Sequence, residues 1–583
     1  MKTARTHARR RPSGALLLLA LAPACSSPQD EQPLADLLAE EPAPAAAGAA
    51  PAAEITLQHL GPPVHHSGAG TGRFVPVLNE AFEVERAMAT VSFTDAYYRA
   101  PANEGYERVL DHVAAELRAA GFGGQDARLE LEFLVLPEPV QAWTPRSARL
   151  ELLVPEAAPE ILHAFAEAGD EDRVMLPIHA PACAVEGEVA LTLDELQEGQ
   201  IFVTAAPLRQ VLNRAVQKRP AAVISASIQS FNADPTGAER HLDAIQFQKV
   251  PDGTTTPVAQ ISTRTLRAIE AASMRDDGVR LRLEASVERE ERPLRTLVAT
   301  IVGSRRPQEA VVTVSHVQEP GACDNASGVG GLLEGARSLV ESLREGALEW
   351  PDRSLVFIWG DEFVQSEVWL DQSSRRAVAG LSSDMTGESP ERTGAIALLE
   401  RMPDPGAVHP IPPDVHTPWG AGTVDPESLL PNGLAVIARC AMVDVGLLEG
   451  GSWQTADHPW EGGSDHDVFI QRGIPAALFW HFTDFTYHTS IDRLDMVDGE
   501  ELRRTTVALL GTAMALASPQ PADLDRYVRS LKLEEDVRVA AALEAGEEEL
   551  AESWTDWCLG ARMWLRAECL PGVEHGDPLP EDR

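Results

Sequence analysis

Apolar runs typical of buried β-strands alternate with helical segments between residues 295 and 516, and this alternation constrains the fold more than any other feature of the chain. Four runs have the length and composition of buried strands: 310–316 (AVVTVSH), 354–360 (SLVFIWG), 378–384 (VAGLSSD) and 476–480 (AALFW). Helices are expected over 327–345 and 500–517. Because strands that alternate with helices form largely parallel sheets, we expect an α/β fold with a mostly parallel central sheet and helices on both faces.

Polar side chains follow these four strands, at the sheet edge where parallel α/β proteins place their sites. In chain order they are His316 and Asp324, Asp361 and Glu362, Asp384, and finally Tyr487 and His488. Taken singly, such residues are most often helix caps, surface groups or solvated turns. Their order at successive strand ends of one unit indicates a site instead. Two imidazoles with three or four carboxylates suit two zinc ions that share one bridging carboxylate and keep a position open for water.

Five segments in this region also carry a family resemblance: GACDNASGVGGLLEGAR, GDEFVQS, SSDMTGE, GGSDHDVFIQRGIPA and YHTSIDRLD. They resemble the co-catalytic zinc exopeptidases of metallopeptidase family 28, a group of aminopeptidases, glutamate carboxypeptidases and glutaminyl cyclases. The resemblance covers the core and, more loosely, the helical run at 78–122. It implies the zinc exopeptidase fold and two Zn²⁺ ions per chain.

The resemblance also implies a role for each polar residue at the strand ends. His316 and Asp384 would bind one zinc ion, Glu362 and His488 the other, and Asp324 would bridge them. Asp361 stands at the position of the family's general base, and Tyr487 at that of a tyrosine that stabilises the oxyanion. The segment Ser464-Asp465-His466 matches a signature that supports the site without binding metal, and Asp492 is a candidate partner of the ligands.

Two positions depart from the family pattern. Asp361 is one methylene shorter than the usual glutamate, so a proton-transfer role there would be weakened or retuned. Gln318 replaces the acidic residue that usually orients the first histidine, which leaves the orientation of His316 to another group.

The leading functional interpretation is an exported zinc-dependent exopeptidase, an aminopeptidase, that cleaves peptide bonds through a metal-bound hydroxide. One alternative is a glutaminyl cyclase-like acyltransferase, which needs one zinc ion. The other is a metal-retaining homologue that binds peptides without turnover. The expected partner is a peptide or protein substrate. The balance of 49 basic and 89 acidic residues gives a net charge of -40, which excludes nucleic acid and anionic lipid surfaces as partners.

The remaining segments suggest a division into six parts. We expect a signal peptide with a lipoprotein-like box at 1–25, a disordered linker at 26–74 and the N-terminal part of the peptidase unit at 75–174. An inserted α/β domain at 175–292 resembles the protease-associated domain, although a generic small α/β domain fits the same pattern. The zinc peptidase core would span 293–518 and a C-terminal helical extension 519–583.

The N-terminal segment predicts export. Basic residues precede a short apolar run that ends at Cys25, which is too short to span a bilayer as a mature anchor. Lipidation of Cys25 would make the protein a cell-envelope lipoprotein on the periplasmic or outer surface, with the lipid anchor as its sole membrane contact. Plain cleavage would make it a secreted protein. Among the other cysteines, Cys558 and Cys569 could form a disulfide or remain free thiols on one helix.

Overall fold

The structure is a computed structural model that describes residues 68–570 except 168, 276 and 277. The expected signal peptide, Cys25 and most of the expected linker therefore lie outside the described residues. The linker was expected to reach residue 74, but Gly70–Arg73 forms a 3-10 turn. The Gly70 N–H donates to the Asp523 carboxylate at 2.6 Å, so this part of the chain is packed against the C-terminal region.

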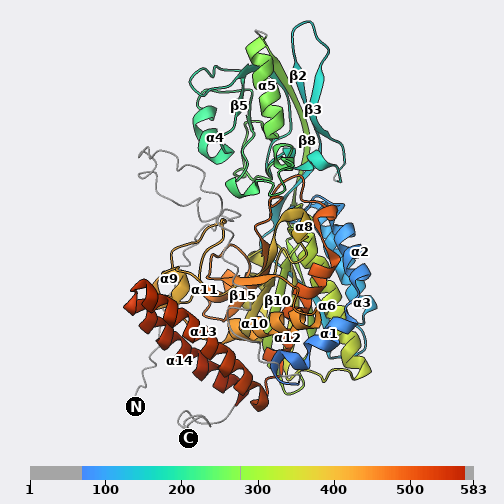
Figure 1. Ribbon diagram of the computed structural model, residues 1–583. Coiled ribbons are helices and arrows are strands. Elements are labelled where there is room, and N and C mark those ends of the chain that lie inside the picture. The colour runs from blue at the N-terminus through green and yellow to red at the C-terminus, as the bar shows by residue number, and fades with distance from the viewer. Residues whose placement is uncertain (1–67, 168, 276–277, 571–583) are drawn as a thin grey trace, which may run out of the picture.

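Two sheets divide the described chain into a large unit and a smaller outer domain, which stands above the large unit in Figure 1. The large sheet has eight strands in the order β1-β9-β11-β10-β12-β15-β13-β14. The strands are β1 (Leu129–Val135), β9 (Arg295–Ile301), β10 (Arg306–His316), β11 (Arg353–Gly360), β12 (Arg376–Ser383), β13 (Ile396–Glu400), β14 (Thr455–His458) and β15 (Ala476–Phe482).

The four central strands β11, β10, β12 and β15 are mutually parallel, as the sequence predicts. Antiparallel pairing joins β1 to β9, β9 to β11 and β13 to β15, so both outer parts of the sheet depart from the parallel pattern. Three of the four predicted strands lie within a central strand, and the fourth, 378–384, extends one residue beyond the end of β12 at Ser383. Their carboxyl ends consequently meet at a single edge of the sheet.

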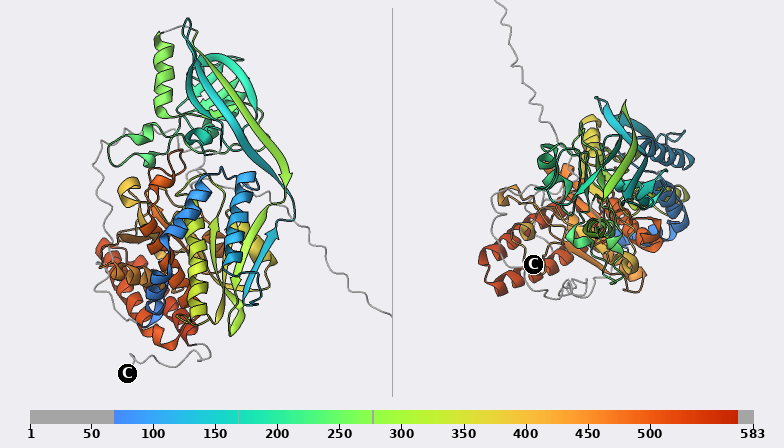
Figure 2. Two further views of the ribbon diagram at one scale, coloured as in Figure 1. Left: turned by 90° about the vertical axis from the view of Figure 1, so that its right-hand side faces the viewer. Right: turned by 90° about the horizontal axis from the view of Figure 1, so that it is seen from above.

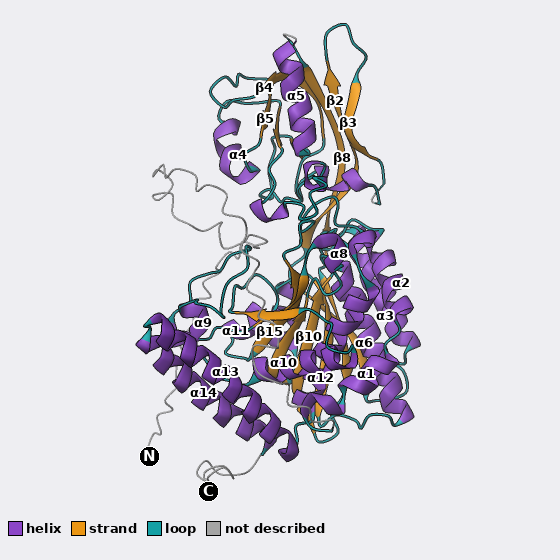
Figure 3. Cartoon of the chain, viewed as in Figure 1, coloured by secondary structure: helices purple, strands orange, loops and turns teal. Residues whose placement is uncertain are grey.

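Helices cover both faces of this sheet, which Figure 3 shows with strands in orange and helices in purple. The helices of the large unit are α1 (Val75–Ala81), α2 (Val84–Asp95), α3 (Glu104–Ala119), α6 (Ala326–Glu345), α7 (Val364–Gln372), α8 (Pro390–Thr393), α9 (Pro405–Val408), α10 (Leu434–Leu448), α11 (His466–Gln471) and α12 (Gly499–Ala517). Alternate residues of β11 divide between two apolar clusters: Phe357 packs with α6 and α12, and Ile358 packs with Trp369 of α7 and Phe469 of α11. This alternation is what a strand buried on both faces requires.

The outer domain is a seven-stranded sheet in the order β3-β2-β8-β4-β5-β6-β7. Its elements are β2 (Val140–Leu153), β3 (Glu160–Phe165), β4 (Cys183–Ala190), β5 (Ile201–Thr204), α4 (Leu208–Val216), β6 (Ala222–Ser225), β7 (Val258–Gln260), α5 (Thr263–Arg275) and β8 (Arg280–Arg292). The long pair β2–β8 runs from the large unit into this domain (Figure 2).

This sheet shifts the domain boundary expected at residue 175. Strands β2 and β3, expected in the peptidase unit, belong to the outer sheet because β2 pairs with β8 along its whole length. The outer domain therefore begins near Val140. The register Val140↔Arg292 brings the two connections to the large unit side by side.

The C-terminal extension is helical, as expected, and consists of α13 (Leu524–Ala545) and α14 (Glu548–Cys569). Both helices pack into the main apolar cluster, and Arg353 at the start of β11 bonds Glu568 at 2.6 Å. Cys558 and Cys569 lie buried on α14, and all five cysteines of the described residues are free. Among the described residues there is no helix with the length and apolarity needed to cross a membrane.

Candidate active site

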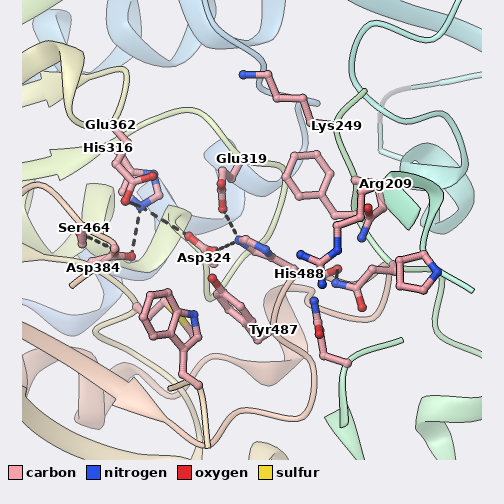
Figure 4. Close-up of a pocket in the computed structure, with 18 of the residues that line it drawn as sticks. Arg209, Lys249, His316, Glu319, Asp324, Glu362, Asp384, Ser464, Tyr487 and His488 are labelled. Atoms are coloured by element: carbon pink, nitrogen blue, oxygen red, sulfur yellow. Dashed lines mark hydrogen bonds and ion pairs between the residues drawn. The ribbon is translucent and has the colours of Figure 1, made fainter. Parts of the chain in front are cut away.

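The side chains that follow the four central strands converge at one edge of the large sheet (Figure 4), and residues of the outer domain line the same cavity. His316 is the last residue of β10, Glu362 follows β11, Asp384 follows β12 and His488 lies in the segment after β15. Asp324 lies in the loop between β10 and α6. The sheet topology therefore brings together residues that are up to 172 positions apart in the sequence.

Asp324 lies between the two histidines. Its Oδ1 is 3.5 Å from His316 Nε2, and its Oδ2 is 2.9 Å from His488 Nε2. Asp384 Oδ1 is 3.1 Å from the same nitrogen of His316. His316, Asp324 and Asp384 are buried, which keeps water from satisfying their ligand atoms. One carboxylate thus faces two separate imidazoles, as a bridging ligand must.

Glu319 is the residue of this cluster that sequence reasoning missed. Its Oε2 lies 2.7 Å from His488 Nε2, and its side chain is buried. Glu319, Asp324 and His488 each offer a ligand atom within 4.8 Å of the others. The signal was present in the segment SHVQEPG, where an acidic residue follows His316 by three positions. Burial disfavours the charged form of Glu319, but His488 lowers its pKa well below the usual value.

Glu362 and Asp361 are adjacent in the sequence but occupy different surroundings. Glu362 Oε1 lies 4.0 Å from His316 Nε2, and its Oε2 accepts a hydrogen bond from Gln318 Nε2 at 3.3 Å. Glu362 therefore lies on the His316 side of the cluster. Asp361 is absent from the described residues that line the cavity over the site, and burial raises its pKa to about 7.

Gln318 stands where the family has an acidic residue, and its main chain still orients His316. His316 Nδ1 lies 3.0 Å from the main-chain carbonyl of Gln318, which therefore accepts its proton and directs Nε2 toward the carboxylates. The Gln318 side chain has a second use. Its Oε1 accepts the Glu362 N–H at 2.8 Å, so it holds the backbone at Glu362 as well as the carboxylate.

The loop that carries Asp324 is held by Asp492. This carboxylate accepts the backbone N–H groups of Ala322, Cys323 and Asp324 at 3.1, 2.6 and 3.0 Å. A side chain at Gly321 would collide with Asp492, since an added Cβ would lie 1.9 Å from Oδ2. Asp492 is thus the partner that the sequence suggested, and it acts on the backbone of the loop.

Asn325 fixes the start of α6 beside the same loop. Its Oδ1 caps the helix by accepting the Gly328 N–H at 3.1 Å, and its Nδ2 donates to main-chain carbonyls of His316 and Ser383. The Asn325 side chain therefore caps α6 and also links the ends of β10 and β12.

The Ser464-Asp465-His466 segment supports the site without joining the metal-binding groups. Ser464 Oγ donates to Asp384 Oδ2 at 2.8 Å. Asp465 accepts the Phe363 N–H at 3.1 Å and the Ser366 hydroxyl at 2.6 Å, and so holds the turn that follows Glu362. His466 lies 2.8 Å from Glu400.

The outer domain holds the segment that carries His488. The His488 carbonyl accepts the Phe247 N–H at 2.7 Å and the Gln246 side-chain amide at 2.8 Å. Asn232 Nδ2 donates to the Tyr487 carbonyl at 2.9 Å. The position of one candidate ligand therefore depends on a domain outside the catalytic sheet.

A cavity of about 620 Å³ lies between the two units, directly over the cluster. Its apolar wall is formed by Phe231 and Phe247 of the outer domain and by Trp419 and Trp480 of the large unit. Tyr487 also lines it, with its ring stacked on that of His488 at a centroid distance of 3.8 Å. The Tyr487 hydroxyl points to the side of the cluster on which Asp324 lies (Figure 4).

The residues present fit two zinc ions. Asp324 Oδ1 and Asp384 Oδ1 are buried and accept no hydrogen bond from any described residue. Buried oxygens without a hydrogen bond are expected where a carboxylate binds a cation. Imidazole and carboxylate are also the donor types that zinc takes in catalytic sites. Another buried group, Glu400, His458 and Glu461, does not fit. His458 Nε2 accepts from Trp480 and its Nδ1 faces the Pro459 carbonyl, so both ring nitrogens are engaged.

Comparisons with known proteins agree with this geometry. Residues 296–394 match the sequence model of Peptidase family M28. This match contains His316, Asp324, Glu362 and Asp384. Among curated proteins, none matches the chain.

Several solved structures are similar to this chain. A Peptidase M28 precursor from Shewanella amazonensis SB2B shares 19% identity, with 76% of this chain and 95% of that chain covered and a TM-score of 0.53. An aminopeptidase from Aneurinibacillus sp. strain AM-1 shares 16% identity, with 76% and 96% covered and a TM-score of 0.45. BSAP, a zinc aminopeptidase from Bacillus subtilis, shares 15% identity, with 74% and 95% covered and a TM-score of 0.48. At these identities the comparisons show similarity of fold alone. That conclusion rests on the Shewanella structure, whose TM-score of 0.53 is the highest of the three.

Proposed function

Because the unit that carries this site belongs to peptidase family M28 and is a metallopeptidase, we propose that the protein is an exported aminopeptidase with two zinc ions per chain. The observation that carries the proposal is the position of Asp324. Its two oxygens face the Nε2 atoms of His316 and His488 at 3.5 and 2.9 Å, and one of them is buried without a hydrogen bond from a described residue. A bridging carboxylate between two imidazoles is what a two-zinc hydrolase requires.

The chain's own residues supply binding, orientation and proton transfer. When bound, zinc ions would supply the Lewis acid that activates water and polarises the scissile carbonyl. The carboxyl groups beside them include one that can take the proton of the attacking water and return it to the leaving amine. The Tyr487 hydroxyl, directed toward the cluster, can donate to the oxygen on which negative charge develops.

The size and lining of the cavity support cleavage of short peptides. The outer domain covers the cluster, and a cavity of about 620 Å³ has room for a few residues. The apolar wall of Phe231, Phe247, Trp419 and Trp480 offers a surface for an apolar side chain.

The proposal also includes export and a lipid anchor at Cys25, and these two points rest on separate evidence. They rest on the basic and apolar composition of the first 25 residues. Metabolic labelling with a fatty acid, followed by detergent partitioning of wild type and Cys25→Ser, tests this part by itself. Equal partitioning of the two forms would leave ordinary secretion.

An activity panel tests the peptidase proposal. Purified protein is assayed with aminoacyl-coumarins, with the same substrates carrying an N-acetyl group, and with peptides that report on release of the C-terminal residue. We expect turnover of the unblocked aminoacyl substrates, loss with chelator and recovery with zinc. Release from the C-terminus alone would contradict aminopeptidase activity, and cyclisation of N-terminal glutamine would indicate the acyltransferase alternative.

A further inference from the structure

The C-terminal hairpin α13–α14 is joined to the large unit by a group of buried charges. Figure 1 shows the hairpin beside α9, the short helix that precedes Asp414. Arg538 of α13 is buried, and its Nε donates to the two oxygens of Asp414 at 3.2 and 3.0 Å. Arg401, which follows β13, donates to the same carboxylate at 2.7 Å. Burial opposes ionisation of Asp414, but the two guanidinium groups hold its pKa below the usual value.

The segment that contains Asp414 continues into the wall of the cavity. Trp419 lies five residues further along the chain and lines the cavity. Between the two, Thr417 donates its hydroxyl to Glu461 at 2.7 Å and its N–H to the same carboxylate. Residues 411–420 form neither helix nor strand. The path of this loop therefore depends on side-chain contacts at Asp414 and Thr417, because no ladder of backbone hydrogen bonds holds it.

Trp419 lies beside the candidate metal-binding residues. Its ring packs on Gly463, where an added Cβ would lie 2.5 Å from a ring carbon. The next residue, Ser464, donates to Asp384 at 2.8 Å. The Trp419 ring also belongs to an apolar cluster with Met385, the residue after Asp384. The indole thus forms the part of the apolar wall that adjoins Asp384.

These contacts connect the C-terminal hairpin to the cavity. On the basis of the peptidase function above, we propose that Trp419 selects substrates with a large apolar side chain and that Arg538 positions Trp419. Arg538 binds Asp414, and Asp414 fixes the loop that carries Trp419. No described residue of the hairpin lines the cavity, so Arg538 acts on the substrate only through this loop.

Selectivity is measured as the ratio of kcat/KM for phenylalanyl-coumarin to kcat/KM for alanyl-coumarin. Trp419→Ala should lower this ratio by roughly tenfold or more, since an apolar contact worth one methylene already changes such ratios by about that factor. Arg538→Lys keeps the charge but loses the planar fork, so the ratio should fall roughly threefold to fivefold, the worth of about one hydrogen bond. In a Trp419→Ala background, Arg538→Lys should no longer change the ratio.

Arg562→Met is the matched control for a role confined to stability. Arg562 of α14 donates to Glu535 of α13 at 2.6 Å, and neither residue bonds to the described residues 411–420. This variant breaks an ion pair of the same hairpin and should keep wild-type selectivity. Asp414→Asn keeps the size of the side chain, should lower the ratio as Arg538→Lys does, and decides the question if Arg538→Lys does not fold.

Hydrogen exchange of the purified protein reports on the loop without turnover. The N–H groups of Thr417, Trp419 and Gly420 are hydrogen-bonded, and they should exchange faster in Arg538→Lys than in wild type or Arg562→Met. Wild-type selectivity in Arg538→Lys, or an equal loss with and without Trp419, would overturn the inference. If wild type cleaves neither coumarin, the proposed function is contradicted instead, and the exchange rates alone decide whether Arg538 positions Trp419.

Discussion

The side-chain amide of Gln246 donates a hydrogen bond to the main-chain carbonyl of His488 at 2.8 Å. Gln246 belongs to the outer domain and is buried, whereas His488 is a candidate ligand at the edge of the large sheet. The same carbonyl accepts the Phe247 N–H at 2.7 Å. The outer domain therefore covers the cavity and also holds one metal-binding residue in place.

Replacing Gln246 with Ala should weaken binding of the zinc ion that His488 would hold. The lost hydrogen bond is worth about 1 kcal/mol, so we expect a roughly fivefold higher Kd for that ion, with little change for the ion that His316 would hold. Competition with a chromophoric chelator measures both constants. Gln210→Ala, an exposed glutamine on α4, is the matched control and should bind zinc as wild type does. Equal affinities in the two variants would show that the outer domain does not position His488.

Replacing Asp492 with Asn should loosen the loop that carries the bridging carboxylate. The Asp492 carboxylate accepts three backbone N–H groups, and an amide has one acceptor oxygen for them. We expect weaker binding of both zinc ions, because Asp324 serves both, and a melting temperature several degrees lower in the apoprotein. Differential scanning fluorimetry with and without zinc measures this. Asp495→Asn, an exposed neighbour, should leave both quantities unchanged.

Cationic side chains from the outer domain should favour short peptides with a free C-terminal carboxylate. Arg209 and Lys249 line the cavity opposite the carboxylate floor, and both residues are exposed (Figure 4). An exposed ion pair contributes up to about 1 kcal/mol, so removing either cation should lower kcat/KM for a tripeptide roughly threefold to fivefold. The C-terminally amidated tripeptide should be affected less. Steady-state kinetics of Arg209→Gln and Lys249→Gln test this against Arg214→Gln, an exposed arginine of α4 that does not line the cavity.

Stability of the large unit should decrease at alkaline pH through His481. Its Nδ1 lies 3.2 Å from Glu388, and its Nε2 lies 3.6 Å from Glu501. Burial alone would lower the pKa of His481, but the neighbouring carboxylates of Glu388 and Glu501 raise it to about 10. Because the folded-state pKa exceeds the unfolded value of about 6.5, the stabilisation is fully present below pH 6.5 and is lost as the pH rises through 10.

Urea unfolding of the zinc-free protein between pH 6 and 10.5 measures this effect. We expect the free energy of unfolding to fall by on the order of a few kcal/mol over the range. In His481→Gln the fall should be smaller, since that side chain does not titrate. A wild-type profile that matches the variant at every pH would contradict the role of His481.

The positions of the site residues at strand ends could be read from the sequence because the information is local. Apolar runs of strand length identify β10, β11, β12 and β15, and the polar residue that ends or follows each run is necessarily at its carboxyl end. Parallel pairing then places all four ends at one edge. The predicted helix over 327–345 is confirmed as α6, Ala326–Glu345, because its apolar residues recur at helical spacing.

Contacts between distant segments were decided by the tertiary structure. The pairing of β2 with β8 joins residues 127 to 152 positions apart, from Leu153↔Arg280 to Val140↔Arg292, and it moved the boundary of the outer domain from 175 to about 140. The same holds for Gln246 and His488, whose hydrogen bond no local pattern encodes.

The sequence by itself determined which residue types gather at the site, but not which carboxylate faces which imidazole. A motif places Asp361 and Glu362 after a strand, yet the direction of each side chain depends on the backbone torsions of loops. Glu319, Phe363 and His488 all have positive φ, which sequence periodicity does not report. The contact of Glu319 with His488 therefore follows from two strained loops that only the folded core holds together.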